Sequence, residues 1–154
     1  MFIGIVGARK YKDKQSVIDF VNGLPADSVI VTGSCKGPCR WAASEARSRG
    51  LRTVIFSPDL TNVHGRFEVA KRYYEKNRQL VQTSEILHAF ISKEGGFTGG
   101  TRFEVEYALQ IGTEVGLHWE GSIYKTVYQR TFSFIHSGKT FFSDWKRFFV
   151  ETFA

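Results

Sequence analysis

Short apolar runs alternate with longer amphipathic stretches over most of the chain. An apolar run that ends at a glycine or a polar residue is typical of a strand buried on both faces of a parallel sheet. A stretch with apolar residues three and four positions apart is typical of a helix that packs on such a sheet. The patterns predict strands at 2–6, 28–32, 52–57, 86–92 and 115–119 and helices at 16–24, 38–49, 66–82 and 102–111.

This alternation of strands and helices predicts the fold class. Strands joined through helices pair in parallel by right-handed crossovers, which places helices on both faces of the sheet. We therefore expect an α/β fold with a Rossmann-like parallel sheet of about five strands. A chain of 154 residues can bury one core, and 42% hydrophobic against 23% charged residues excludes a disordered protein.

Residues 120–154 form an aromatic-rich C-terminal extension of the core, 1–119. Its aromatic residues between 124 and 135 predict one or two strands. Ser143 or Asp144 is expected to cap a final helix with an apolar stripe of Trp and Phe. We expect the extension to pack either on the core or on a second subunit, and the second arrangement predicts a homodimer or higher homo-oligomer.

The charge balance indicates the chemical class of the partner. A net charge of +6 and a pI of about 9.4 favour anionic partners such as nucleotides, polyphosphates or nucleic acid. No apolar run reaches the roughly 20 residues of a membrane span, so no membrane partner is expected. The first residues lack the basic start and the cleavage site of a signal peptide. A cytoplasmic location with reduced cysteines follows as the expectation.

The cysteines and histidines predict no metal site. Cys35 and Cys39 have no His or Cys partner at metal-ligand spacing, so neither a metal nor a cofactor is expected. A structural role is expected for the histidines, which show no partner pattern: His64, His88, His118 and His136.

Three glycine-bearing segments follow predicted strands, at the edge where open parallel sheets bind ligands. Glycine lets a backbone approach a phosphate, and the free N–H groups of a following helix point at the anion. The segments are Gly7-Ala8-Arg9, Thr32 to Gly37 and Gly95 to Thr101. None of them contains G-x-x-x-x-G-K-[ST] or G-x-G-x-x-G, which excludes a P-loop hydrolase and an ordinary dinucleotide dehydrogenase. A pocket for a phosphate-bearing, nucleotide-like ligand is therefore predicted.

At these residues the chain resembles the SLOG (SMF/DprA–LOG) superfamily of Rossmann-like nucleotide-binding proteins, and its YspA-like group most closely. The G-x-R-[DK]-[YF] start of that group matches 7–11, and its G-[GS]-x-[RK]-G turn matches 33–37. Its [RK]-N signature matches Lys76-Asn77, and its G-T-x-x-E motif matches 100–104. The resemblance spans 2–119 and implies a nucleotide-like ligand held between the second and fourth strand ends.

Within this superfamily, similar motifs in the Lonely Guy branch carry a phosphoribohydrolase that splits a nucleoside monophosphate into base and ribose phosphate. The resemblance implies that Glu104 is the ribose-binding or catalytic carboxylate. The chain departs from that branch at 96–98, where the branch has Pro-Gly-Gly, and at Lys76, where it has arginine, although Arg78 lies nearby. Cys39 occupies a position that is acidic in YspA-like members.

Three functions stay open at this point. We favour binding of a nucleotide-like small molecule, followed by N-glycosidic cleavage of a nucleoside monophosphate, and then by single-stranded nucleic-acid binding as in the DNA-processing branch. Glu104 is the candidate catalytic residue, although it could instead be a surface residue paired with Arg102 or Lys93, and Glu106 is expected at the surface. The candidate ligand-binding residues are Gly7, Ala8, Arg9, Gly33, Ser34, Lys36, Gly37, Asn77, Arg78, Gly99, Gly100 and Thr101.

Overall fold

The computed structural model describes residues 1–122, 124–131 and 144–151. Strands and helices of the core alternate in the predicted order, with ends shifted by a few residues. They are β1 (Phe2–Gly7), α1 (Lys14–Asn22), β2 (Val29–Gly33), α2 (Pro38–Ser48), β3 (Arg52–Phe56), α3 (Arg66–Thr83), β4 (Ile86–Ile91), α4 (Gly99–Ile111) and β5 (Glu114–Trp119).

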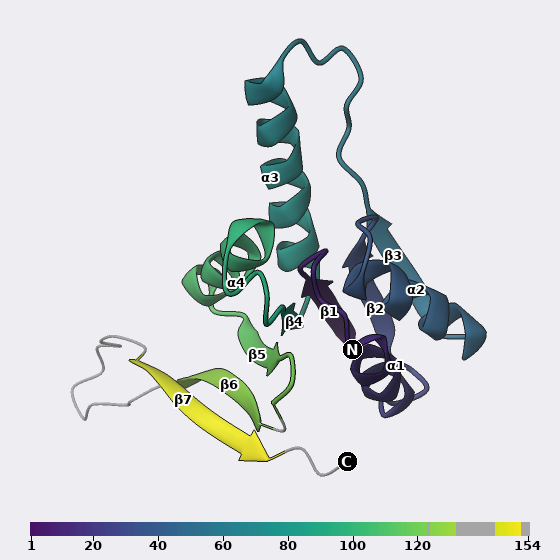
Figure 1. Cartoon of the computed structure of the whole chain (residues 1–154), viewed down its shortest axis with the longest axis vertical. Helices are drawn as coiled ribbons and strands as arrows, with labels where there is room; N and C mark the ends of the chain where they lie inside the picture. The colour runs from purple at the N-terminus through teal and green to yellow at the C-terminus, as the bar shows by residue number, and fades with distance from the viewer. Residues whose placement is uncertain (123, 132–143, 152–154) are drawn as a thin grey trace, which may run out of the picture.

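The sheet has the strand order β3-β2-β1-β4-β5-β6-β7 (Figure 1). Its first five strands pair in parallel, which confirms the predicted Rossmann-like α/β fold. From β1 the chain proceeds outward through β2 to β3, and then crosses back to place β4 on the other side of β1. Such a reversal between adjacent strands opens a crevice at their carboxyl ends, where ligands bind in open α/β sheets.

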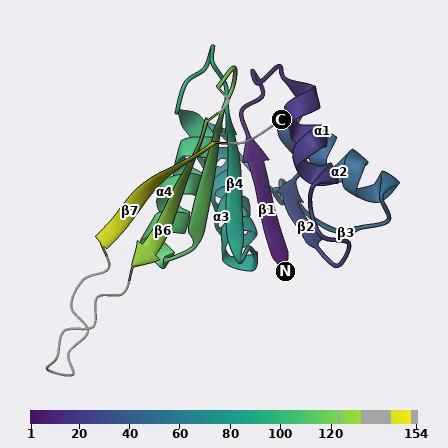
Figure 2. The same ribbon diagram turned by 90° about the horizontal axis from the view of Figure 1, so that it is seen from below.

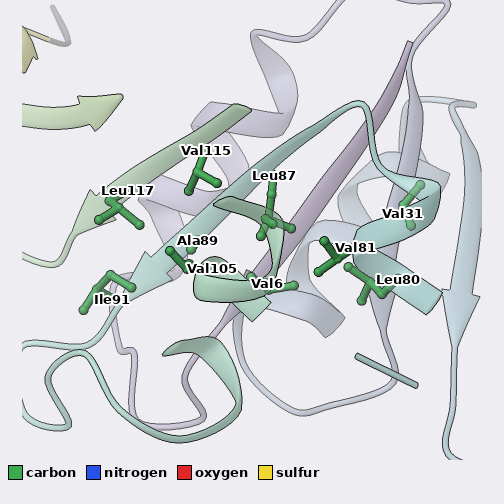
Figure 3. Close-up of a cluster of buried hydrophobic side chains, with 11 residues drawn as sticks. Val6, Val31, Leu80, Val81, Leu87, Ala89, Ile91, Val105, Val115 and Leu117 are labelled. Atoms are coloured by element: carbon green, nitrogen blue, oxygen red, sulfur yellow. The ribbon is translucent and has the colours of Figure 1, made fainter. Parts of the chain in front are cut away.

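Helices cover both faces of the sheet, as predicted (Figures 1 and 2). On one face, α1 and α2 pack through Val17, Val21, Ala42 and Ala46. On the other face, α3 and α4 bury Leu80, Val81, Val105 and Ala108 against the strands (Figure 3). Both clusters contain sheet residues that are almost fully buried, so the central strands are covered on both sides.

Local signals explain where the helices begin. Asp13 accepts a hydrogen bond from the Ser16 amide at 3.1 Å, so α1 begins before the predicted residue. Pro38 occupies the first turn of α2, where its missing N–H is not needed. The capping position before it, Gly37, has a φ of +85°, and a Cβ there would lie 3.3 Å from the Ala8 carbonyl oxygen. Glycine therefore suits both the backbone angle and the close approach of the β1–α1 loop.

The C-terminal extension continues the sheet with β6 (Tyr124–Thr131) and β7 (Asp144–Glu151). β6 pairs antiparallel with β5, and β7 pairs antiparallel with β6. The predicted final helix is wrong over Asp144–Glu151, which is a strand. Aromatic and β-branched residues favour extended backbone, and pairing with β6 supplies hydrogen bonds that outweigh the helical spacing of the aromatics. Ser143, His136 and the other residues at 132–143 and 152–154 lie outside the described residues.

No helix in the described ranges is long and apolar enough to cross a membrane.

Candidate ligand-binding site

An open pocket of about 570 Å³ lies at the carboxyl ends of β1 and β4, a volume typical of small-molecule sites. Its walls come from the β1–α1 loop, the start of α2, one face of α3 and the start of α4. The lining residues are Gly7, Ala8, Arg9, Lys10, Cys35, Cys39, Ala70, Tyr73, Tyr74, Lys76, Asn77, Gly95, Thr98, Gly99, Gly100, Thr101 and Glu104.

The start of α4 forms one wall of the pocket. Thr98 is the capping residue, but its side chain makes no capping hydrogen bond to the helix. Gly99, Gly100 and Thr101 form the first turn and all line the pocket. The first N–H groups of a helix have no partner within the helix and carry its positive dipole end. This wall therefore suits an anion such as a phosphate.

Asn77 on α3 lies directly beside that helix start. A Cβ on Gly100 would be 3.5 Å from Asn77 Nδ2. The side chain is 5% exposed and lines the pocket, and within the described part of the chain it makes no hydrogen bond. The amide atoms are reached by solvent from the pocket, since no fully buried side-chain nitrogen or oxygen among the described residues lacks a hydrogen-bond partner. Asn77 is thus ready to bind a polar group placed at the start of α4.

Lys76 and Glu104 face each other at the base of the pocket. Lys76 Nζ lies 3.9 Å from Glu104 Oε1, and both residues are 5% exposed. Burial raises the pKa of Glu104 to about 7, although the nearby Lys76 ammonium lowers it in part. Glu104 can therefore exchange a proton near neutral pH, a property suited to general acid or base chemistry. The same residue lies on the inward face of α4 with Thr101 and Val105, so the alternative surface position is wrong.

Cys39 contributes a thiol rather than a thiolate to the pocket wall. Burial raises its pKa to about 11, with a further increase from the Glu104 carboxylate. Its Sγ lies 3.9 Å from the carbonyl oxygen of Ile5, which is a weak contact. A protonated, buried thiol is a poor nucleophile, so Cys39 serves as an uncharged wall residue.

Carboxylates hold the loops at the pocket rim. Lys10 and Lys12 both pair with Glu94, at 3.5 and 3.0 Å. Glu120, just after β5, accepts hydrogen bonds from the backbone amides of Lys12 at 2.7 Å and Lys93 at 2.8 Å. Because these amides belong to the β1–α1 and β4–α4 loops, one carboxylate joins the two loops that flank the pocket.

The structure places the predicted site residues in two groups. Those that line the pocket are Gly7, Ala8, Arg9, Asn77, Gly99, Gly100, Thr101 and Glu104. Those that do not line it are Gly33, Ser34, Lys36, Gly37 and Arg78. The Arg78 guanidinium lies 5.5 Å from the centre of the Phe103 ring instead. Gly33 lies under Lys76, since a Cβ there would be 3.2 Å from Lys76 Nζ.

Several lining residues were absent from the predicted set. The most informative are Lys76, Tyr73 and Ala70 of α3 and the two cysteines. Helical spacing places Ala70, Tyr73 and Asn77 on one face of α3. The prediction that Asn77 contacts the ligand could therefore have been extended to the other two residues. The sequence indicates Lys76 through the [RK]-N signature and as a departure from an arginine, but not as a ligand-binding residue. Glu106 is exposed, as predicted, and pairs with Arg102 at 2.7 Å.

Two histidine side chains contact each other outside this pocket, which the sequence did not predict. His88 Nδ1 and His118 Nε2 are 3.0 Å apart, and both rings lie against Phe20. Among the described residues, no group of three or more His, Cys, Asp or Glu side chains could hold a metal ion.

The chain is similar in fold to two solved structures of DNA processing protein A (DprA). The protein from Streptococcus pneumoniae has a TM-score of 0.60 and 18% identity, over 75% of this chain and 49% of that one. The protein from Helicobacter pylori, described in its single-stranded DNA binding mode, has a TM-score of 0.58 and 17% identity, over 76% of this chain and 64% of that one. The match thus spans about half to two thirds of those proteins.

No protein-family model matches the chain, and no curated protein matches it. At these identities the likeness concerns the fold alone. The Rossmann-like fold expected from the SLOG resemblance is therefore the fold observed, shared with two DprA proteins.

Proposed function

We propose that the pocket binds a phosphate-bearing nucleotide or nucleotide-derived ligand. The observation that carries the proposal is the uncapped start of α4 beside the Asn77 amide, which lines the pocket without a hydrogen-bond partner among the described residues. The helix start offers N–H groups and a positive dipole end, and Asn77 adds a directed polar group. Arg9 and Lys10 on the opposite loop supply cationic charge. An anion with attached polar groups satisfies all of them.

The sugar of such a ligand would lie toward the base of the pocket. Glu104 and Lys76 are 3.9 Å apart there, too far for a direct hydrogen bond. Sugar hydroxyl groups both donate and accept hydrogen bonds, so they can bind a carboxyl group and an ammonium at once. This placement agrees with the ribose role that the SLOG resemblance implies for Glu104.

Thermal unfolding with a panel of nucleoside monophosphates tests the proposal. A ligand that binds only the folded state raises Tm with its concentration. Gly100→Val should abolish the shift, since the valine methyls would fill the space beside Asn77. Thr101→Val should weaken it, whereas Thr61→Val, the same change on the exposed loop after β3, should leave it intact. Equal shifts in all variants would place binding elsewhere.

A second candidate function is N-glycosidic cleavage of a nucleoside monophosphate. The specific observation behind it is Glu104, a pocket carboxyl group whose pKa is raised to about 7. Such a group can orient an attacking water or stabilise an oxocarbenium-like centre. Incubation with nucleoside monophosphates should release free base, and Glu104→Gln should stop the release without unfolding the chain. No release over a broad panel would exclude this activity.

Single-stranded nucleic-acid binding is the third candidate. It is supported by the fold shared with the Helicobacter pylori protein, whose structure concerns single-stranded DNA binding, and by the net charge of +6. Binding of a labelled oligonucleotide should weaken steeply with salt, because cations on the protein displace counterions from the phosphates. Absence of binding at low salt would exclude this function.

Three further expectations stay predictions. They are membership in the YspA-like group, a homo-oligomer formed through residues 120–154, and a cytoplasmic location. Light scattering of the full chain and of a chain ending at 122 checks the second, with folding of the shorter chain verified by circular dichroism. The same oligomeric state of both chains would contradict a homo-oligomer formed through residues 120–154.

A further inference from the structure

One face of α3 forms the apolar side of the pocket. Ala70, Tyr73 and Asn77 lie at positions i, i+3 and i+7 and all line the pocket. The amino-terminal half of this helix extends beyond the ends of the strands (Figure 1). Asn77 is the residue of this face that reaches the start of α4. Tyr73 lies one turn further along the helix.

Tyr73 differs from the neighbouring Tyr74 in the contacts that its ring makes among the described residues. The Tyr74 ring packs edge-on against Phe103, with centroids 4.6 Å apart, and Phe103 stacks with Tyr107. Tyr74 also lines the pocket, but its ring is held in the contact between α3 and α4. Tyr73 is half-buried in the pocket wall, and in the described ranges it makes no ring contact or hydrogen bond. Its ring is free to contact a ligand.

The distance along α3 matches the build of a mononucleotide. Four residues separate Tyr73 from Asn77, which is about 6 Å along a helix axis. A phosphate at the start of α4 would lie beside Asn77, and a group one sugar away would reach Tyr73. The next lining residue of this face, a turn beyond, is Ala70, whose small side chain is exposed. A sugar phosphate alone would leave this apolar wall in contact with water.

We propose that Tyr73 is the base-stacking residue of the pocket, which makes its ligand a nucleoside 5′-monophosphate with the phosphate at α4 and the base against α3. The inference rests on the proposed nucleotide-binding function and specifies its orientation and ligand class. Stacking on a tyrosine accepts any base, because every base has a π face. The pocket thus distinguishes nucleotides from sugar phosphates more strongly than it distinguishes one base from another.

Calorimetric titration of the full chain with adenosine 5′-monophosphate, uridine 5′-monophosphate and ribose 5-phosphate tests the proposal. Both nucleotides should bind about 10-fold to 100-fold more tightly than ribose 5-phosphate, the range expected for one base stack. Tyr73→Leu keeps an apolar side chain but removes the ring, and it should reduce this preference to nearly none. Tyr73→Phe should retain it. Phe67→Ala, on the same helix but 85% exposed and outside the pocket, is the matched control and should bind like the wild type.

The outcomes separate the two proposals. Equal affinities of the wild type for the nucleotides and for ribose 5-phosphate would overturn the stacking role and leave the phosphate pocket standing. An unchanged preference in Tyr73→Leu would also overturn it. No binding of any of the three compounds to folded wild type would instead refute the proposed function itself. Circular dichroism of each variant confirms that the fold is intact.

Discussion

The ammonium of Lys76 and the carboxyl group of Glu104 lie 3.9 Å apart at the base of the pocket, with both residues 5% exposed. They come from α3 and α4, which pack side by side on one face of the sheet (Figure 1). Burying two charges disfavours ionisation, and their mutual attraction offsets only part of that penalty. The pKa of Glu104 is accordingly raised, even with a cation next to it.

This raised pKa predicts the pH dependence of stability. Glu104 binds its proton more tightly in the folded state, with a pKa of about 7, than in the unfolded chain, where it is near 4.5. The resulting stabilisation is fully present below about pH 4.5 and is lost as pH rises through about 7. Its size is on the order of 3 kcal/mol, from the difference between the two pKa values.

Denaturant unfolding of wild type and Glu104→Gln between pH 4 and 8 measures this contribution. Glutamine resembles the protonated acid at every pH, so the wild type should lose stability relative to the variant as pH rises. A constant difference across this range would contradict the raised pKa.

Replacing Lys76 with methionine should raise the pKa of Glu104 further. The ammonium lowers that pKa by attraction, and methionine keeps a long side chain without the charge. Titration of the Glu104 carboxyl carbon by NMR should show a midpoint above that of the wild type. Lys71→Met, which removes an exposed charge from the same helix, should leave the midpoint in place. The same midpoint in both variants would mean that Lys76 and Glu104 are not paired in solution.

Gly7→Ala should destabilise the fold through a clash at the pocket edge. A Cβ on Gly7 would lie 2.6 Å from Pro38 Cγ and 3.1 Å from Phe90 Cβ. Because the proline ring is rigid, α2 must shift, and overpacking of this kind costs about 1–3 kcal/mol. Equilibrium unfolding in urea measures the loss.

Gly23→Ala provides the control for that glycine substitution. Gly23 has a φ of −79°, which suits alanine, and the nearest atoms to a new Cβ are 3.6 Å away. The free energy of unfolding should rise by about 0.4–1 kcal/mol, because alanine restricts the unfolded chain. Equal effects of the two substitutions would show that Gly7 does not pack closely on Pro38.

Glu120→Ala should loosen both loops that flank the pocket. The variant removes the acceptor for the Lys12 and Lys93 amides, at a cost of about 0.5–1.5 kcal/mol per hydrogen bond. Hydrogen exchange at these two amides should become faster, and ligand affinity should fall because binding must then order the loops. Glu85→Ala removes a similar contact to the Phe2 amide and should leave both amides and the affinity unchanged. Unchanged exchange at Lys12 and Lys93 in Glu120→Ala would exclude this role.

The inward position of Glu104 was within reach of the sequence, but its partner was not. Thr101, Glu104, Val105 and Ala108 follow helical spacing, and all four are buried. The helical period alone therefore places Glu104 and the exposed Glu106 on different faces of α4. Pairing with Lys76 depends on how α3 packs against α4, and no local pattern reports such a contact between residues so far apart in the chain.

The second glycine segment, Thr32 to Gly37, shows a similar limit to what the sequence can predict. Its glycines were predicted to contact the ligand, yet Cys35 is the only residue of Thr32 to Gly37 among the described lining residues. Gly33 is covered by Lys76, and Gly37 packs against the Ala8 carbonyl. A glycine signals a tight backbone path, and only the packed structure shows whether a ligand or another part of the protein occupies the space beside it.

By itself, the sequence determined the order and type of the core elements and the end of the sheet where the pocket lies. These follow from short-range periodicity and from the right-handed connection of parallel strands, which brings the strand ends to one edge. Tertiary structure decided that Asp144–Glu151 pairs as a strand, that Lys76 meets Glu104, and that Tyr73 faces the pocket. Each of these depends on contacts between distant segments, whose free energy arises only when the elements pack together.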